Sequence, residues 1–401
     1  MQPINAHCAH THEYKLGDYR FGMKCIVKVV QTKRQWNDFV ALPRKIYRDN
    51  LCYVPDMEAD VRGWFNPKHN PGLQHCEVVP FVAYNEGGEP VGRIVGIINH
   101  KANQIWKGSC VRFGWIEFVD DLEVSAALLK AIEDWGRAKG MDSIQGPLGI
   151  SDFDKEGMLI EDFDKMGSPI TIYNPPYYPE HMTAHGYGKE VDWVQVKVAI
   201  PAEVPERFAR AEKLVTEMYG LKVKKLTLHE VFKEGYGRKI FRLLNDAYSQ
   251  LFGYTPHSDE EADAFVNEYI RMLDLEMLPM VEDDKGNLIA CCITMPNLSR
   301  ALQKSGGRMF PFGWYHLLRA LKFKHEDEVE LLLIAVHPEW QALGINALIF
   351  SDLIPILNKK KFHWAETGPM LEDNQKVLTQ WKVLNPTIHK RRRCFSKELK
   401  G

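Results

Sequence analysis

The sequence predicts a mixed α/β fold, with a mixed central sheet flanked by helices in each of two halves. Strand-like apolar runs alternate with segments of helical periodicity, and the same order of elements occurs twice. The length of 401 residues also exceeds what one hydrophobic core usually supports. We therefore expect two domains, 23–200 and 201–401, related by internal duplication.

The elements of the first half follow from local patterns. Asn85-Glu86-Gly87-Gly88 between two apolar runs predicts a hairpin. Apolar residues from Val124 to Trp135 recur on one helical face, and Gly140 ends that helix. The expected strands are 25–30, 78–84, 90–99, 111–118, 143–145 and 191–200, and the expected helices are 35–48, 124–139 and 177–182.

The second half repeats this order after Pro201 and Pro205. Its hairpin turns at Asp283-Asp284-Lys285-Gly286, and its most apolar strand is 328–336. The other expected strands are 276–282, 287–295, 362–366 and 389–395, and the expected helices are 206–219, 235–252, 259–273 and those beginning at 345 and 372.

Composition excludes several classes of protein. With 45% apolar and 26% charged residues, the chain is typical of globular proteins. The formal net charge of −2 gives no basic field for nucleic acid, so no nucleic-acid partner is expected. No apolar run approaches the ~18 residues of a membrane span. The eight cysteines include no CxxC pair and are expected to be reduced in a cytoplasmic protein.

The first 22 residues form a polar leader that we expect to be disordered. Cys8, His10 and His12 gather there. Three potential ligands on a flexible segment rarely form a metal site, so no metal is expected. Regular sequence begins at Met23, which is a candidate natural start.

The loop after strand 328–336 has the features of an anion site. Pro338 ends the strand, and Gln341 to Ala347 then carries no acidic side chain. Gly344 allows close approach to the backbone, and the free amides of a helix start attract a diphosphate. The alternative is an ordinary strand-to-helix turn that needs glycine for its geometry.

The matching place in the first half reads Val119-Asp120-Asp121-Leu122-Glu123. Asp120 or Asp121 is a suitable helix cap. Three carboxylates would repel a diphosphate, since each like-charge pair costs about 1 kcal/mol at ~4 Å even in water. The pattern therefore predicts an anion site only in the second half.

The pattern V-x-P-x-W-Q-x-x-G-x-x-A-L, beginning at Val336, resembles the acyl-CoA-binding segment of the Gcn5-related N-acetyltransferase (GNAT) superfamily. Asn346 stands where glycine or alanine is commoner. From Met23 onward the chain also resembles bacterial tandem proteins of this fold, a group that includes bacterial ceramide synthases. The motifs behind this likeness are Leu42-Pro43-x-x-x-Tyr47, Val54-Pro55, Gly92-Arg93-Ile94, Gly146-Pro147 and Tyr173-Asn174-Pro175-Pro176-Tyr177-Tyr178.

The resemblance implies two tandem acyl-CoA N-acyltransferase-like domains, of which the first is a degenerate copy. It implies acyl-CoA, with an acetyl or a longer chain, as co-substrate, held by the second half. The residues expected to contact it are Ile334, Ala335, Val336, Gln341, Ala342, Leu343, Gly344, Ile345, Asn346, Ala347 and Asn374. Asn374 has the alternative role of a helix cap.

Transfer to an amine also needs a base and, in some enzymes, an acid for the thiolate. Glu366 and Glu372 are the candidate bases. Glu366 has the alternative of a buried ion pair, and Glu372 that of a helix-start charge. The resemblance places the usual tyrosine acid at Trp381, so either no side-chain acid is used or catalysis is impaired.

The acceptor side is less determined. The segment 308–323 is the most aromatic of the chain, and Trp314 lies there with Leu317, Leu318 and Leu321 at helical spacing. It is either a surface for a lipid at a membrane interface or an amphipathic helix packed on the sheet. Asp152, Tyr173 and Asn174, in a long loop, are candidate acceptor-binding residues.

We therefore expect an acyl-CoA-dependent N-acyltransferase that acts on a small or lipid-like primary amine, with peripheral contact to the inner membrane as a candidate location. The alternatives are ceramide-synthase-like transfer of a long acyl chain to a sphingoid base, a non-catalytic acyl-CoA-binding scaffold, and aminoacyl transfer from tRNA. The near-neutral charge argues against the last. The sequence gives no oligomeric state.

Overall fold

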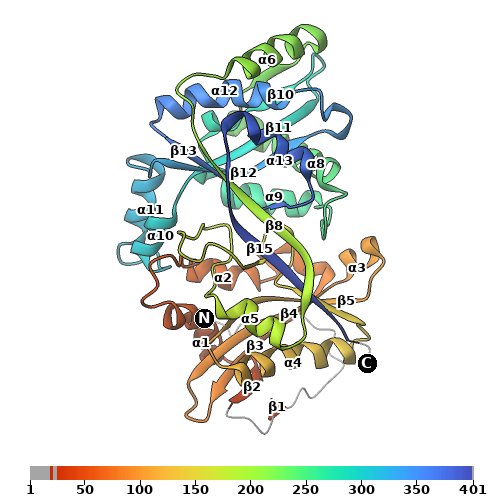
Figure 1. Ribbon diagram of the computed structural model, residues 1–401, viewed down its shortest axis with the longest axis vertical. Helices are drawn as coiled ribbons and strands as arrows, with labels where there is room; N and C mark the ends of the chain where they lie inside the picture. The colour runs from red at the N-terminus through yellow and green to blue at the C-terminus, as the bar shows by residue number, and fades with distance from the viewer. Residues whose placement is uncertain (1–18, 21–24, 400–401) are drawn as a thin grey trace. The chain divides into compact units, whose positions relative to one another are not determined.

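The computed structural model describes residues 19–20 and 25–399 (Figure 1). The predicted leader site at Cys8, His10 and His12 lies outside the described residues. The chain divides into two compact units. The first holds Met1–Asp192, Leu302–Gly313 and Arg391–Gly401, and the second holds Trp193–Ala301 and Trp314–Lys390. The domain boundary predicted at residue 200 stays a prediction.

The first unit is built on a sheet in the order β1-β2-β3-β4-β5-β6, with the end of β15 pairing to β6. Among the pairings of the described residues in this sheet, β5 with β6 is the parallel one. In chain order the elements are β1 (Tyr19–Arg20), β2 (Cys25–Val29), α1 (Lys33–Ile46), α2 (Glu58–Trp64), η1 (Pro71–His75), β3 (Cys76–Asn85), β4 (Pro90–Asn99), α3 (His100–Trp106), β5 (Cys110–Phe118), α4 (Leu122–Ala138), β6 (Ser143–Gly146), β7 (Met158–Leu159), α5 (Tyr177–Ala184), β8 (Gly188–Ala199, to Asp192) and β15 (Thr387–Glu398, from Arg391).

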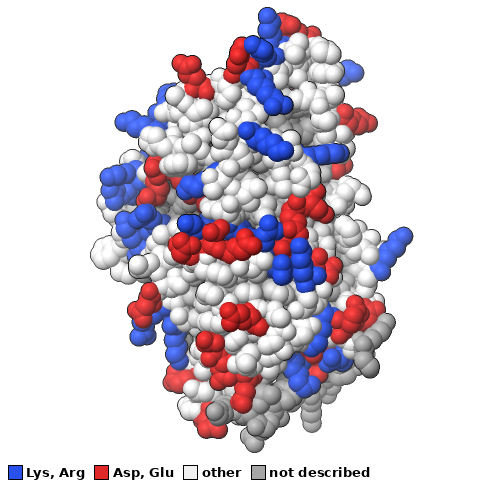
Figure 2. All heavy atoms as spheres, viewed as in Figure 1, with Lys and Arg blue, Asp and Glu red and all other residues white. Residues whose placement is uncertain are grey.

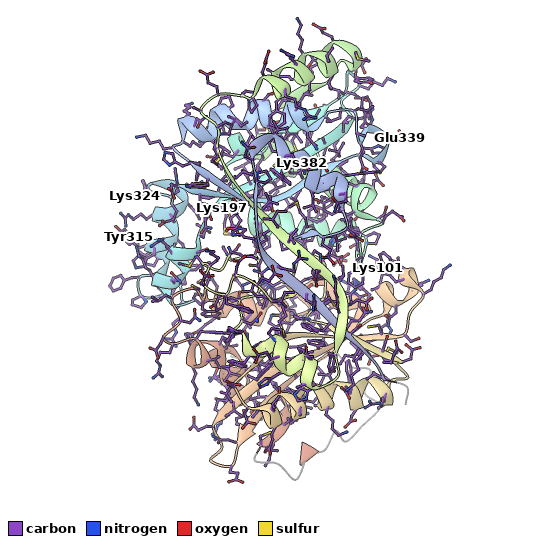
Figure 3. All side chains as sticks on the ribbon, in the orientation of Figure 1. Lys101, Lys197, Tyr315, Lys324, Glu339 and Lys382 are labelled. Carbon is purple, nitrogen blue, oxygen red and sulfur yellow. The ribbon has the colours of Figure 1, made fainter. Side chains whose placement is uncertain are left out.

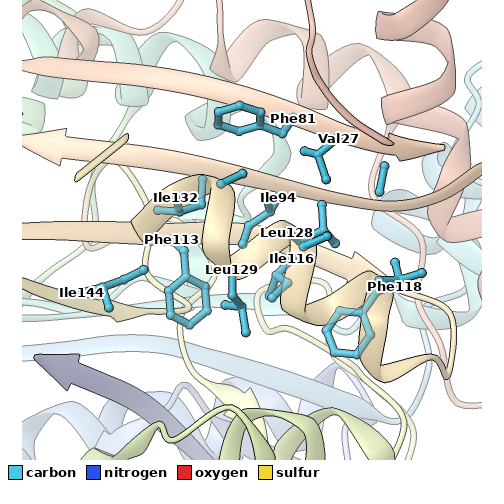
Figure 4. Packing of buried hydrophobic residues seen from close by; sticks show 14 of the residues in the cluster. Val27, Phe81, Ile94, Phe113, Ile116, Phe118, Leu128, Leu129, Ile132 and Ile144 are labelled. Carbon is cyan, nitrogen blue, oxygen red and sulfur yellow. The ribbon is translucent and has the colours of Figure 1, made fainter. Parts of the chain in front are cut away.

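Both faces of this sheet are covered, because its strands bury alternate residues on opposite sides. Phe81 of β3 and Ile94 of β4 face α4, where they pack with Leu128 and Ile132 (Figure 4). The neighbouring residues of these strands, among them Val82, belong to the core under α1 and α2. The first unit is therefore a three-layer structure of helix, sheet and helix.

The second unit has a sheet in the order β8-β13-β12-β11-β10-β9, in which only β12 and β13 run parallel. One apolar core lies under α6 and α12, and another under α7, α8 and α9. Its elements are β8 (from Trp193), α6 (Glu206–Tyr219), β9 (Lys222–Lys224), α7 (Leu228–Lys233), α8 (Tyr236–Tyr248), α9 (Asp259–Tyr269), η2 (Ile270–Met272), η3 (Leu275–Met277), β10 (Met280–Glu282), β11 (Leu288–Pro296), α10 (Ser299–Ser305, to Ala301), α11 (Gly313–Lys322), β12 (Glu328–Val336), η4 (Pro338–Trp340), α12 (Asn346–Lys359), β13 (Trp364–Thr367), β14 (Met370–Leu371), α13 (Gln375–Gln380), η5 (Trp381–Leu384) and β15 (to Lys390).

The predicted mixed α/β fold is confirmed, and each predicted strand and helix has a counterpart. The bounds of β12 are those predicted. The strand predicted at 276–282 is shorter, because Leu275–Met277 forms a 3₁₀ turn. The missed elements, such as β9 and α7, are too short to show a periodicity.

Phe395 of β15 tests whether the end of the chain completes the first core. Its side chain is 2% exposed and packs in the cluster around α4. We expect Phe395→Ala to lower the free energy of unfolding by about 3–5 kcal/mol, measured by denaturant titration. The matched control is Phe323→Ala, at a side chain 80% exposed, with an expected change within about 0.5 kcal/mol. Equal effects would contradict the placement of β15 in this core.

Candidate functional site

In the second unit, β12 loses its parallel neighbour halfway along its length. Pairing with β13 runs from Glu328↔Trp364 to Leu331↔Thr367 and stops there, whereas pairing with β11 continues to Val336. A bulge at Leu332 marks the change, since the register with β11 skips that residue. Among the described residues, the last four of β12 therefore pair in register with β11 alone.

The backbone groups on the open side of β12 belong to Ile334 and Val336. His337 donates its N–H to Ile289 O at 2.9 Å. Because every second residue of an antiparallel strand bonds to the same neighbour, Ala335 and Leu333 also face β11, and Ile334 and Val336 face the other side. Ile334 O accepts from Tyr248 Oη at 3.0 Å, and Val336 O accepts from Gln341 Nε2 at 3.2 Å. Leu332, Leu333 and Ile334 are only partly buried. Ile334 and Val336, which are expected to contact acyl-CoA, therefore present their backbone on an accessible strand edge.

The loop from Gln341 to Gly344 is exposed and turns through left-handed backbone at Ala342 (φ 64°) and Gly344 (φ 83°). This conformation favours glycine at position 344. The helix α12 that follows has Ile345 at its N-cap, with no side-chain hydrogen bond to its free amides. Glu339, labelled in Figure 3, lies on the 3₁₀ turn before the loop. The uncapped start that the sequence predicted is thus present in the fold.

Two buried polar atoms beside this loop have no hydrogen-bond partner within the described part of the chain. They are His337 Nδ1 and Asn346 Oδ1. The amide nitrogen of Asn346 donates to Gln380 Oε1 at 2.5 Å, which fixes the side chain. Buried polar atoms are nearly always paired in folded proteins, so these two are suited to meet a ligand.

Glu366, a predicted base, is 2% exposed and forms a buried ion pair. Lys390 Nζ lies 2.6 Å from its Oε1, Gln195 Nε2 donates to the same atom at 2.9 Å, and His389 Nε2 lies 3.5 Å away. Burial alone would raise the pKa of Glu366. The nearby His389 ring and the charge of Lys390 outweigh burial and hold this pKa at about 2. The carboxylate is therefore charged at neutral pH and weakly basic.

The other predicted residues after β13 lie around α13. Asn374 caps this helix, accepting from Val377 N at 3.3 Å, which is the alternative role foreseen for it. Glu372 is half-buried in the preceding turn. Trp381 is 1% exposed, and its Nε1 donates to Met370 Sδ at 3.3 Å. Trp381 is thus a core residue, and its position offers no proton donor.

Tyr248 is a candidate functional residue that sequence reasoning missed. It ends α8, and its hydroxyl reaches the open side of β12 at Ile334 O. Burial raises the pKa of Tyr248, so the phenol stays protonated at neutral pH. No local signal marks it, because the contact joins residues 86 positions apart.

The corresponding place in the first unit is closed. The chain after β6 follows β5, with Leu148 N donating to Phe113 O at 2.8 Å. Leu148 is 2% exposed, so it fills the space beside the strand. Asp121 caps α4 by accepting from Glu123 N at 2.8 Å, and Asp120 lies 3.1 Å from His181 Nε2. In the first unit, carboxylates occupy the helix start and a chain segment covers the strand edge. In the second unit the helix start is uncapped and the strand edge is open.

The predicted acceptor residues fall in both units. Tyr173 and Asn174 are buried in the first unit, where Asn174 bonds both backbone groups of Leu159 at 2.7 and 3.0 Å. Tyr173 donates to Phe163 O at 2.9 Å, so both side chains brace their loop. Asp152 is half-buried in the same unit. Trp314 belongs to the second unit and is 46% exposed.

Two known proteins are similar in sequence to this chain over most of its length. No family model matches the sequence. Protein YghO of Escherichia coli (strain K12) is 25% identical over 385 residues, 93% of this chain and 95% of that protein. The bacterial ceramide synthase of Caulobacter vibrioides is 28% identical over 313 residues, 78% of this chain and 80% of that protein.

Solved structures show the same likeness at the level of the fold. A tandem GNAT protein from the clavulanic acid biosynthesis pathway aligns over 94% of this chain and 99% of its own, with a TM-score of 0.53 and 11% identity. A GCN5-related N-acetyltransferase from Sphaerobacter thermophilus aligns over 94% and 96%, with a TM-score of 0.51 and 12% identity. The chain has the tandem GNAT fold, and the predicted resemblance is confirmed.

An acyl-CoA, which this fold implies, fits the residues at the open edge of β12. The uncapped start of α12 offers amides to an anion, and Asn346 Oδ1 and His337 Nδ1 offer polar atoms that lack partners within the described residues. The described residues contain no cluster of three or more potential metal ligands and no helix long and apolar enough to span a bilayer.

The buried pair of Glu366 and Lys390 gives a stability test. We expect Glu366→Gln to lower the free energy of unfolding by about 3–5 kcal/mol, because it removes the carboxylate that pairs with the buried Lys390 charge. The folded-state pKa is depressed from 4.5 to about 2, so the stabilisation is present above pH 4.5 and is lost as the pH falls toward 2. Denaturation across this range measures it.

Glu372→Gln is the matched control, at a half-buried side chain, with an expected change under about 1 kcal/mol. A Glu366→Gln protein of unchanged stability and abolished turnover would contradict the structural role and support a catalytic one.

Proposed function

We propose that this protein is an acyl-CoA-dependent N-acyltransferase whose second unit binds the CoA thioester. The acceptor is a primary amine that is small or lipid-like. The tandem GNAT fold supports this class of reaction.

The observation that carries the proposal is the contrast between two equivalent places. Beside β12 the strand edge is open and the next helix is uncapped. Beside β5 the chain itself fills the edge, and Asp121 occupies the helix start. Free amides stabilise a bound diphosphate, and a carboxylate repels it. The place beside β12 is therefore suited to CoA, and the place beside β5 is not.

The chain's own residues have distinct roles in this proposal. The amides from Ala342 to Asn346 hold the diphosphate, because those of Gln341 and Ala347 donate to Pro338 O and Gly344 O. The backbone of Ile334 and Val336 holds the rest of the donor along the strand edge. Acyl-CoA supplies an activated thioester. Bond formation from the amine nitrogen to the acyl carbon breaks the C–S bond, the ammonium proton goes to a base, and the thiolate takes a proton.

The proton carriers remain candidates. Glu366 and Glu372 are the predicted bases, and the low pKa of Glu366 favours Glu372 or a water for this step. Tyr248 is the candidate donor to the thiolate, because it stays protonated and reaches the open edge of β12. Trp381 is buried and takes no part.

Gly344→Asp tests the diphosphate site. A carboxylate in the loop should repel the anion, so the thermal shift produced by CoA should be lost. At a hundred times its dissociation constant, a ligand stabilises the wild type by about 2.7 kcal/mol. Gly235→Asp is the matched control, since Gly235 also has left-handed backbone (φ 75°) and open space for a Cβ. An unchanged shift in Gly344→Asp would place the site elsewhere.

Acyl-chain length and acceptor separate the finer alternatives. The relative named bacterial ceramide synthase favours a long-chain donor and a sphingoid amine as the second candidate function. If that candidate holds, thiol release with a sphingoid base should be greater from palmitoyl-CoA than from acetyl-CoA. If it does not hold, thiol release with small amines should be greater from acetyl-CoA than from palmitoyl-CoA. Binding of both thioesters without thiol release for any amine would contradict an enzyme and leave the scaffold.

A further inference from the structure

The outward side of α11 in the second unit is apolar. Trp314, Tyr315 and Leu318 are 46%, 50% and 44% exposed, and Phe323 just after the helix is 80% exposed. Large apolar side chains exposed one at a time are normal on proteins, but a group on one helix marks an interaction surface.

Packing on the core does not explain these residues, because α11 has a separate inner face. Gly313 and Ala320 are buried, and Leu317 and Leu321 are partly buried. Their spacing is that of one helical face. Helical spacing in the sequence groups Trp314 and Leu318 with Leu317 and Leu321. The structure separates them, so α11 is apolar on two sides.

Cations lie among the exposed apolar residues. Arg319, Lys322 and Lys324 are exposed within the same ten or so residues of chain. Figure 2 shows Lys and Arg gathered over α11, and Figure 3 shows Tyr315 and Lys324 pointing outward on that side. The sequence contains no Asp or Glu from Leu298 to His325. This stretch is therefore strongly cationic in a chain whose net charge is −2.

We propose that this surface docks onto an anionic lipid bilayer. We call it the α11 surface, and it consists of Trp314, Tyr315, Leu318, Arg319, Lys322, Phe323 and Lys324. Aromatic side chains are suited to the headgroup region, and Lys or Arg beside them are attracted to anionic headgroups. A second copy of the same surface would bring like charges together, so a symmetric dimer is disfavoured.

Peripheral docking is consistent with the helix lengths, because within the described residues no helix could cross a bilayer. The proposal does not depend on the proposed function. It requires only that α11 lie at the lipid surface with its inner face still packed on the protein. If the acceptor is a lipid amine, docking would also bring the protein to its substrate.

Charge reversal tests the electrostatic half of the proposal. Full-length protein is sedimented with phosphatidylcholine vesicles, with and without phosphatidylglycerol. Wild type should bind the anionic vesicles and bind the neutral ones weakly. The combined variant Arg319→Glu, Lys322→Glu and Lys324→Glu should weaken binding on the order of a hundredfold. Lys213→Glu, Lys233→Glu and Lys285→Glu together make the same charge change on exposed lysines elsewhere and should retain most of the binding.

Polar substitution tests the apolar half. Trp314→Gln, Leu318→Gln and Phe323→Gln together should lower binding to anionic vesicles at least about tenfold while leaving the melting temperature close to wild type. The matched control replaces Leu214, Met218 and Leu228, which are also exposed, with glutamine. It should bind as wild type does.

Three results would overturn the proposal. The first is equal binding of wild type to neutral and anionic vesicles. The second is unchanged binding in both α11 variants, which would place any membrane contact elsewhere. The third is no vesicle binding together with self-association that the glutamine variant abolishes, which would make the α11 surface a contact between copies.

Discussion

The separation of β13 from β12 after Leu331 is the constraint on which the candidate site depends. A central strand normally has both backbone edges paired, and an open edge in a buried sheet is costly unless something meets it. Here the separation leaves the backbone of Ile334 and Val336 without a neighbouring strand on one side. The residues from Leu332 to Ile334 are partly accessible there. The bulge at Leu332 accompanies the change, and Tyr248 meets one of the freed carbonyls. The exposed loop and uncapped helix then continue from the same strand, so one departure from regular pairing organises the whole region.

In the first unit, the corresponding strand edge is covered by the chain itself. β5 and β6 are also parallel and also separate, and β5 also has a bulge, at Trp115. There the chain after β6 bonds to β5 and buries Leu148 beside it. Asp121 satisfies the helix start. The two units therefore have similar elements. They differ mainly in whether a chain segment bonds to the backbone at the edge of the central strand. This difference is local, and in the proposed function it separates the unit that binds the thioester from the other unit.

The buried polar groups of the second unit limit the chemistry that it supports. Glu366 Oε1 accepts from both Lys390 and Gln195, and the low pKa of Glu366 makes it a poor acceptor of a proton at neutral pH. Trp381 is enclosed in the core under α12. The groups that the proposal assigns to the open edge are main-chain amides, the protonated phenol of Tyr248, and Glu372 or a water as the base. In the proposed reaction, positioning and hydrogen bonding therefore contribute more than a strong side-chain base.

Local pattern was sufficient for the longer elements and for the asymmetry of the two loops. The apolar run of β12, the glycine of the loop and the acidic helix start of the first half are readable because neighbours along the chain set strand pairing, turn geometry and capping. Contacts between distant segments were not readable. Glu366 meets Lys390, Tyr248 reaches Ile334, and Trp314 turns away from Leu317, according to strand register and helix rotation in the folded chain. Such contacts follow from how whole elements pack, and that packing is settled by the complete core and not by any short stretch of residues.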